Sequence, residues 1–276
     1  MYYILNGIIY LGDKMKVYDK KIIVTGAGAG IGRELVLQLL AKGAHVAALD
    51  INGENLEKLK DESKSDNLSI HVVDVSNDDS INKFKEEYYK RHQVIDGLIN
   101  NAGIIQPFIN IDKLDMDIIN RVMDINFYGP LKLTKMFLPE LLNREEGHIV
   151  NVSSMGGFFP FPGQTVYGAS KAALKLFTEG LYSELLDTNV KVTIVFPGAI
   201  ATDIAKNSKV DMEVKESSSK VKMLSAKKAA EIIINGIKKD KFQLYVGTDS
   251  KIMNFMYKRN PKSAIKFINK KMKDMA

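Results

Sequence analysis

Residues 21–32 read Lys-Ile-Ile-Val-Thr-Gly-Ala-Gly-Ala-Gly-Ile-Gly, and this stretch decides the fold. Its first five residues form an apolar run typical of a buried strand, and leucines at helical spacing follow the last glycine until Gly43. A glycine-rich turn between a strand and a helix lets backbone N–H groups and the positive end of the helix dipole approach a phosphate. The stretch therefore predicts a site for the pyrophosphate of a dinucleotide.

The spacing of the glycines decides which form of this turn is present. The pattern G-x-G-x-x-G is not matched, because Ile31 or Arg33 stands where its last glycine belongs. The pattern T-G-x-x-x-G-x-G is matched instead. A tight strand–helix turn without any ligand is the alternative that this stretch alone leaves open. The dinucleotide contacts expected in the turn are Thr25, Gly26, Gly28, Gly30, Ile31 and Gly32.

Apolar runs and helical patterns alternate along most of the chain. Strand-like runs cover residues 21–25, 45–49, 69–73, 95–99, 148–152, 191–196 and 243–246. Helical patterns cover residues 55–62, 80–91, 116–142, 166–186 and 226–239. Short strands alternating with helices predict a mostly parallel sheet covered on both faces, and right-handed crossovers make it doubly wound. The predicted fold class is α/β: a single Rossmann-type domain over residues 16–250, with a seven-stranded, mostly parallel sheet.

Polar residues follow the next strands, at the sheet edge where such folds bind ligands. Asp50 ends the second strand. A carboxylate there can accept hydrogen bonds from ribose hydroxyls and would repel a 2′-phosphate, so NAD is favoured over NADP. The same residue also suits a helix N-cap, which is compatible with ribose binding. The third and fourth strands are followed by further expected cofactor contacts, which would also suit ordinary turns: Asp74, Val75, Asn101, Ala102 and Gly103.

Tyr167 and Lys171 lie four residues apart in a helical pattern, so they share one face of the helix. A free tyrosine has a pKa near ~10, and a neighbouring cation lowers that pKa. Alone this pattern is weak, because a core tyrosine beside a surface lysine has the same spacing. Ser154 ends the preceding strand, where its hydroxyl can hold a substrate oxygen beside the tyrosine. Asn126 interrupts a long helical pattern, which indicates a local irregularity or a bound water.

These motifs, in this order, resemble those of the short-chain dehydrogenase/reductase family over about residues 16–250. The resemblance places the family's catalytic asparagine, serine, tyrosine and lysine on Asn126, Ser154, Tyr167 and Lys171, with Tyr167 and Lys171 also touching the cofactor. Spacing to the tyrosine selects Ser154 over Ser153. Nicotinamide contacts are implied at Pro197, Gly198, Ile200 and Thr202. The resemblance also implies a substrate lid at about 203–225 and a homodimer or homotetramer.

The implied activity is that of an NAD(H)-dependent oxidoreductase, which transfers hydride between nicotinamide C4 and a secondary alcohol or ketone. Ser154 would hold the substrate oxygen and Tyr167 would move its proton. Lys171 would lower the pKa of Tyr167, and Asn126 would hold a water. The apolar residues 158–162 favour a lipophilic small-molecule substrate, unless they pack in the core or at a subunit interface. Two alternatives are an NADPH-dependent 3-oxoacyl (carrier or thioester) reductase, which Asp50 disfavours, and a non-catalytic nucleotide-sensing protein.

Composition argues against several other classes. The chain has no cysteine and only four scattered histidines, so disulfides and a metal site are not expected. Residues 251–276 carry eight basic side chains and one acidic one, whereas the rest of the chain is nearly neutral. That distribution does not suit a nucleic-acid enzyme. A cytoplasmic protein is expected.

The two ends of the chain depart from the family pattern. Residues 1–15 are expected to be a leader outside the fold, too short to span a bilayer, and Met15 is an alternative start to Met1. Residues 251–276 are expected to form a basic amphipathic tail with a helix from Pro261. One face of that helix would carry Ala264, Ile265, Ile268 and Met272. It would either lie on an anionic membrane surface or dock on the body of the protein.

Overall fold

The computed structural model describes residues 2–5, 8–11, 17–202, 204–208 and 223–273. The alternative start at Met15 and residues 209–222 of the expected lid lie outside these ranges. Two short strands, β1 (Tyr2–Leu5) and β2 (Ile8–Leu11), pair antiparallel in a sheet of their own and add nothing to the main sheet. The leader boundary at residue 15 stays a prediction.

Seven strands form the main sheet, as the sequence predicts, and every neighbouring pair is parallel. They are β3 (Lys21–Thr25), β4 (His45–Asp50), β5 (Leu68–Val72), β6 (Gly97–Asn100), β7 (Gly147–Val152), β8 (Val190–Pro197) and β11 (Gln243–Val246). Their order is β11-β8-β7-β6-β3-β4-β5, so the order of the strands reverses between β6 and β3. The central residues are buried, which explains the unbroken apolar runs of these strands.

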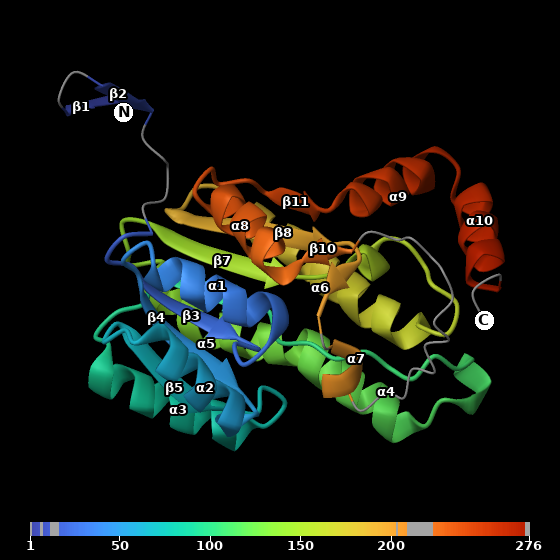
Figure 1. Cartoon of the computed structure of the whole chain (residues 1–276), viewed down its shortest axis with the longest axis horizontal. Coiled ribbons are helices and arrows are strands. Elements are labelled where there is room, and N and C mark those ends of the chain that lie inside the picture. Colours follow the sequence, from blue (N-terminus) through green and yellow to red (C-terminus); the bar gives the residue numbers. More distant parts are fainter. Residues whose placement is uncertain (1, 6–7, 12–16, 203, 209–222, 274–276) are drawn as a thin grey trace.

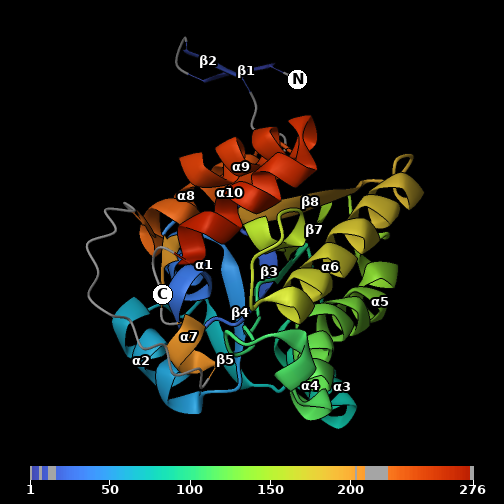
Figure 2. The same cartoon turned by 90° about the vertical axis from the view of Figure 1, so that its right-hand side faces the viewer.

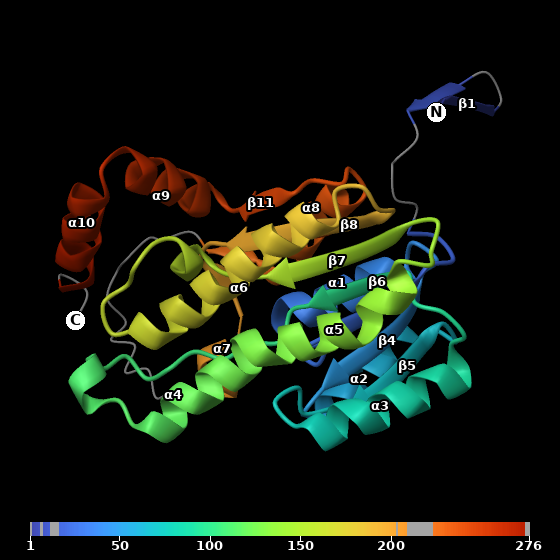
Figure 3. The same cartoon turned by 180° about the vertical axis from the view of Figure 1, so that it is seen from behind.

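Helices cover both faces of the sheet, so the doubly wound prediction is confirmed (Figure 1). On one face lie α1 (Gly30–Leu40), α2 (Gly53–Ser63) and α8 (Ala226–Ile237). On the other lie α3 (Asp78–Arg91), α5 (Gly129–Leu141) and α6 (Thr165–Glu184), which Figure 3 shows from behind. Asparagine side chains cap α2 and α3, and Gly43 with a φ of 79° follows the end of α1, as its position in the sequence predicts.

Short elements connect these layers at the carboxyl edge of the sheet. The helical pattern expected over 116–142 is divided into α4 (Met116–Met123), a π-helical turn η2 (Asp124–Tyr128) and α5. The irregularity expected at Asn126 is therefore confirmed. The 3-10 turns η1 (Ile111–Lys113) and η3 (Met155–Gly157) flank the site. Strand β9 (Ile200–Ala201) pairs parallel with β10 (Leu224–Ser225), and α7 (Ile204–Asn207) follows β9.

Two C-terminal helices, α9 (Thr248–Arg259) and α10 (Pro261–Lys273), lie side by side at the end of β11 (Figure 2). The helix start at Pro261 is confirmed. Ala264, Ile268 and Met272 pack against Phe159, which is fully buried. The apolar face of this helix therefore docks on the body of the protein, which is one of the two interpretations given above. Of the four residues expected on that face, only Ile265 is exposed.

Candidate active site

The glycine turn between β3 and α1 has the geometry of a phosphate cradle. Gly26 and Gly30 have φ values of 63° and 53°, where a side chain would be strained. A Cβ on Gly32 would collide with the carbonyl oxygen of Gly26. Ala29, the N-cap of α1, makes no side-chain cap, and the first turn carries no acidic residue. The N–H groups at this helix end are thus suited to an anion such as the pyrophosphate of a dinucleotide.

Thr25 and Asn101 hold this turn against the end of β6. The Thr25 hydroxyl oxygen accepts hydrogen bonds from the backbone N–H groups of Asn101 and Ala102, both at 3.0 Å. The Asn101 side-chain amide donates to the carbonyls of Thr25 and Gly26 at 3.0 and 3.2 Å. Thr25 is buried, so its side chain positions the turn rather than facing a ligand.

Asp50 lies directly over the glycine turn. Its Oδ2 accepts a hydrogen bond from the Gly28 N–H at 2.8 Å, and its Oδ1 accepts one from the Asn52 N–H at 2.9 Å. Asp74, after β5, accepts from the N–H and hydroxyl of Ser76. Val75 is buried in the core between the sheet and α3, so any contact it makes with a ligand would use its backbone. Asp50 is thus the carboxylate that adjoins the phosphate cradle.

Ser154 and Tyr167 meet at the carboxyl end of β7. The Gly156 N–H donates to Ser154 Oγ at 3.0 Å, which leaves the serine proton for its hydrogen bond with the Tyr167 phenol. That hydrogen bond lowers the pKa of Tyr167, but burial raises it by more. The lowering of this pKa that we expect from Lys171 together with a positively charged nicotinamide stays a prediction, and desolvation of the phenolate dominates in this structure.

Lys171 is buried one helical turn after Tyr167. Its Nζ donates to the Val152 carbonyl at 3.1 Å, and burial lowers its pKa to about 8. Gly103 adjoins it, because a Cβ at that position would lie 2.9 Å from Lys171 Nζ and 3.2 Å from Asn126 Oδ1. Lys171 and Asn126 therefore converge beside the backbone that follows β6.

Asn126 sits in the π-helical turn, where three hydrogen bonds fix its side chain. Its Oδ1 accepts from the Ile104 N–H, and its Nδ2 donates to the Ile104 carbonyl and to Ser170 Oγ, at 2.9, 2.9 and 3.0 Å. Both amide protons are in use, so a water held at this residue would need other donors. Asn126 clamps the loop after β6 onto α6.

The turn after β8 is fixed by the start of α9. The Asp249 carboxylate accepts from the Ala199 N–H at 2.6 Å and lies where a Cβ on Gly198 would be. Ser250 donates to the Phe196 carbonyl at 2.8 Å. Farther along, Thr202 lies beside Gly30, since a Cβ on that glycine would be 3.1 Å from the Thr202 methyl group. The residues expected to contact nicotinamide, Pro197, Gly198, Ile200 and Thr202, thus run from β8 back to the glycine turn.

Sequence reasoning missed Gln106, Gln164, Ser170 and Asp249, which hold the expected site residues in place. Their partners are distant in the chain, and neither glutamine belongs to a recognisable motif. Ser153, set aside on spacing, donates to the Lys171 carbonyl at 2.8 Å and so supports α6 rather than facing Tyr167.

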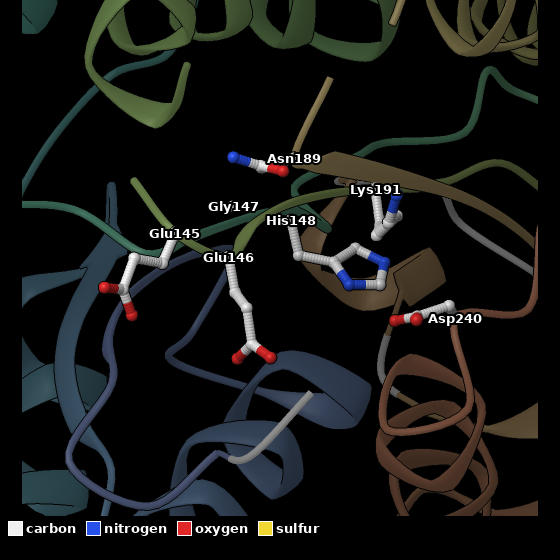
Figure 4. Close-up of a pocket in the computed structure, with 7 residues that line it drawn as sticks. All are labelled: Glu145, Glu146, Gly147, His148, Asn189, Lys191 and Asp240. Carbon is white, nitrogen blue, oxygen red and sulfur yellow. The ribbon is translucent and has the colours of Figure 1, made fainter. Parts of the chain in front are cut away.

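A separate cavity of about 100 Å³ lies at the opposite edge of the sheet, between the amino ends of β7 and β8. In Figure 4 the His148 imidazole lies between the side chains of Glu146 and Asp240. Burial lowers the pKa of His148 to about 3, so the ring is neutral at pH 7. Across the described ranges, no three carboxylate or imidazole side chains are grouped to hold a metal ion.

Comparison with known proteins identifies the family. Residues 20–213 match the family model described as short chain dehydrogenase. SadH of Mycobacterium tuberculosis, an oxidoreductase by name, is 34% identical over 258 residues, which cover 88% of this chain and 91% of SadH. The chain therefore belongs to the short-chain dehydrogenase family, and it is an oxidoreductase with a nicotinamide-cofactor-binding Rossmann fold.

Solved structures share this fold. A short-chain dehydrogenase/reductase from Burkholderia phymatum in complex with NAD has a TM-score of 0.77 at 22% identity, covering 84% of this chain and 90% of that one. A short-chain dehydrogenase from Burkholderia cenocepacia in complex with NADP has a TM-score of 0.77 at 24% identity, covering 92% and 99%. Because both cofactors occur among such neighbours, the fold alone does not choose between them. Among the helices that the structure describes, none is long and apolar enough to cross a membrane.

Proposed function

We propose that this protein is an NAD(H)-dependent dehydrogenase or reductase that interconverts a lipophilic secondary alcohol and its ketone. The observation that carries the proposal is that the Ser154 hydroxyl and the Tyr167 ring meet at Gly156, where a Cβ would lie 3.5 Å from Ser154 Oγ and 3.2 Å from the Tyr167 ring, beside the buried Lys171. A serine hydroxyl next to a phenol can bind a substrate oxygen and exchange its proton. A non-catalytic nucleotide-sensing protein would need Lys171 for its cofactor, but it would not need a serine hydroxyl beside the Tyr167 phenol.

The cradle residues fit a bound dinucleotide, with the pyrophosphate at the α1 N-terminus and the nicotinamide end at the turn after β8. We assign the ribose contact to Asp50. Its carboxylate is held at the glycine turn by the Gly28 and Asn52 N–H groups, where a 2′-phosphate would meet a like charge. This repulsion is the reason for choosing NAD over NADP.

In the proposed mechanism, a nicotinamide held by the glycine turn and the turn after β8 would supply the hydride chemistry. In the oxidation direction, Ser154 holds the alcohol oxygen and Tyr167, as phenolate, takes its proton. In the reduction direction, Tyr167 returns that proton to the carbonyl oxygen. The hydrogen bond with Ser154 offsets part of the desolvation that raises the Tyr167 pKa, and we propose that the Lys171 ammonium favours the phenolate further when the cofactor is bound. Asn126 joins α6 to the loop that follows β6, through its hydrogen bonds to Ser170 and Ile104.

The lipophilic substrate is proposed from the apolar segment between Ser154 and Tyr167, where Phe158 and Phe161 stay partly exposed although they pack against the cluster around Phe159. Phe159 does not contribute, since it is fully buried against α10. A small apolar pocket wall with few polar groups is the usual design of such binding sites. We therefore expect affinity to rise with the apolar area of the alcohol.

Cofactor preference is the first test of this proposal. Calorimetric titration with NADH and NADPH should give tight NADH and weak NADPH binding. Asp50→Ser should weaken NADH binding and improve NADPH binding, while Asp66→Ser, an aspartate remote from the glycine turn, should change neither. A preference of the unmodified protein for NADPH would overturn the assignment of Asp50.

The chemistry has its own test. Tyr167→Phe removes only the phenol oxygen and should abolish alcohol oxidation while leaving NADH binding intact. Tyr128→Phe, on an exposed tyrosine of the π-helical turn, is the matched control and should retain full turnover. If Tyr167→Phe keeps more than a few per cent of the turnover, the proposed catalytic role is wrong.

We further propose a cytoplasmic homo-oligomer with a peripheral membrane contact. Four exposed apolar side chains lie on α6 or just after the ends of α5 and α6 and suit a subunit interface: Leu142, Leu176, Tyr182 and Leu186. The membrane contact would use Ile252, Phe255, Ile265 and Phe267, which are exposed among the lysines of α9 and α10. Sedimentation of the purified protein tests the homo-oligomer. Binding to anionic vesicles at low salt, compared between the unmodified protein and Phe255→Ser, tests the membrane contact. A monomer in sedimentation would contradict the oligomer. Vesicle binding by Phe255→Ser equal to that of the unmodified protein would contradict the membrane contact.

A further inference from the structure

Gln106 lies in the loop after β6 and is completely buried, although its side chain carries a polar amide. No motif marks it. A buried amide is stable only when its donors and acceptors are paired, so the partners of Gln106 show what it does. Its Oε1 accepts hydrogen bonds from the backbone N–H groups of Val166 and Tyr167, at 2.8 and 2.9 Å. Its Nε2 donates to the Gly163 carbonyl at 2.9 Å.

These bonds replace the ordinary cap of α6. The first N–H groups of a helix have no partner within the helix and are usually satisfied by the side chain of the N-cap residue. Gln164, the N-cap of α6, makes no such bond: its Nε2 donates to the Gln106 carbonyl at 2.8 Å, and its buried Oε1 accepts no hydrogen bond from any residue that the structure describes. The cap is supplied from another loop, and one of the capped groups is the amide of Tyr167 itself.

The neighbours of Gln106 connect the same loop to the rest of the site. Gly103 adjoins Lys171, and Ile104 is clamped by the Asn126 side chain. The Ile105 N–H donates to Ser208 Oγ at 3.0 Å, just beyond α7. Consecutive residues of this loop therefore reach α6, the π-helical turn and the segment after β9. Gln106 is the residue of this loop that holds the first turn of α6, which carries Tyr167.

From this geometry we infer that Gln106 is a positioning residue, which sets the place of Tyr167 relative to Ser154 by capping α6. The inference rests on the proposed role of Tyr167 as proton carrier. Gln106 does not touch the phenol; it acts through the backbone of the tyrosine. Losing the cap leaves two buried N–H groups without an acceptor, and the first turn of α6 must move or fray to recover partners. A displacement of about 1 Å at a reacting group can cost about 100-fold in rate.

Gln106→Met tests this, because methionine has a similar length and no acceptor. We expect kcat for alcohol oxidation to fall by about 100-fold, with the Kd for NADH within two-fold of the unmodified protein, since the glycine turn is untouched. Gln38→Met is the matched control: Gln38 also donates to a backbone carbonyl, that of Lys227, but it lies on the exposed part of α1. Its kcat should not change.

Gln106→Glu supplies a second readout that a merely structural role would not move. The carboxylate keeps the acceptor for Val166 and Tyr167 and is favoured at a helix N-terminus, but it loses the donor to the Gly163 carbonyl, so turnover should be restored only in part. Its negative charge raises the pKa of the nearby phenol. The rate of alcohol oxidation should therefore rise with pH at higher pH values than in the unmodified protein.

Each outcome decides the inference. A kcat of Gln106→Met within three-fold of the unmodified protein overturns it, as does an unshifted pH profile in Gln106→Glu. If Gln106→Met does not fold, the pH profile of Gln106→Glu alone decides. Tyr167→Phe, measured alongside, shows whether a failed test overturns the proposed function or only the role of Gln106. Full activity in Tyr167→Phe overturns the proposed function, whereas full activity in Gln106→Met beside an inactive Tyr167→Phe overturns only the role of Gln106.

Discussion

Replacing Lys171 with methionine should abolish turnover and yet stabilise the folded protein at neutral pH. The Lys171 ammonium is buried, and burial lowers its pKa from 10.5 to about 8. Each unit of such a shift corresponds to about 1.4 kcal/mol of folding free energy, so the charge costs roughly 3 kcal/mol at pH 7. Methionine avoids that cost. It also removes the hydrogen bond to the Val152 carbonyl, which costs about 1 kcal/mol. The expected net gain is about 2 kcal/mol.

The sign of the pH dependence makes this prediction specific. Between pH 8 and 10.5 the unfolded chain keeps the lysine proton that the folded chain releases. The free energy of unfolding of the unmodified protein therefore rises with pH in this window, while Lys171→Met gains nothing from this group. The advantage of the variant should be largest at pH 7 and should vanish near pH 10.

Urea unfolding followed by circular dichroism at pH 7 and pH 10 measures both quantities. Lys175→Met, one turn later on α6, is the control. Lys175 pairs with Glu179 at 2.8 Å and is partly exposed, so its loss should cost only about 0.3–0.5 kcal/mol at either pH. A Lys171→Met variant that is less stable than the unmodified protein at pH 7, or whose advantage is the same at pH 10, would refute the reasoning.

Three further substitutions test other parts of the structure. Asp249→Ala removes the acceptor for the Ala199 N–H, so calorimetry should show about ten-fold weaker NADH binding; unchanged affinity would contradict this. Below pH 6.5 the unfolded chain protonates His148 while the folded chain does not until about pH 3. Unfolding free energy therefore falls with falling pH, and His148→Gln should reduce that slope by up to about 1.4 kcal/mol per pH unit. Equal slopes in urea at pH 4–6 would argue against it. Gly32→Ala should lose NADH binding, since its Cβ meets the turn backbone; retained binding would show that the turn can adapt.

Local geometry explains why much of the fold could be predicted from the sequence. The strand at residues 21–25 was predicted with the bounds that β3 has, because an apolar run ended by glycines has few other conformations. The asparagine at position 126 marked the π-helical turn by its poor fit to a regular helix. Both signals lie within a few residues of the feature they announce.

Long-range partners could not be predicted in the same way. The apolar stripe of α10 was evident from helical spacing, but nothing in that spacing names Phe159 as its partner. Gln106 gives no signal, because its importance depends on amides about sixty residues away. The burial that raises the Tyr167 pKa could not be predicted for a related reason: charges can be counted in a sequence, whereas burial depends on packing.

The contacts of α9 and α10 also determine when, during synthesis, parts of the site can be completed. The glycine turn, Asp50 and the loop after β6 come from the first half of the chain and pair among themselves. The turn after β8 gains its Asp249 partner, and Phe159 its cover, only when the last helices have left the ribosome. Because a domain folds as a unit during synthesis, the turn after β8 and the cover over Phe159 cannot be completed until α9 and α10 have emerged. Synthesis of the last two helices is therefore the step that completes the candidate site.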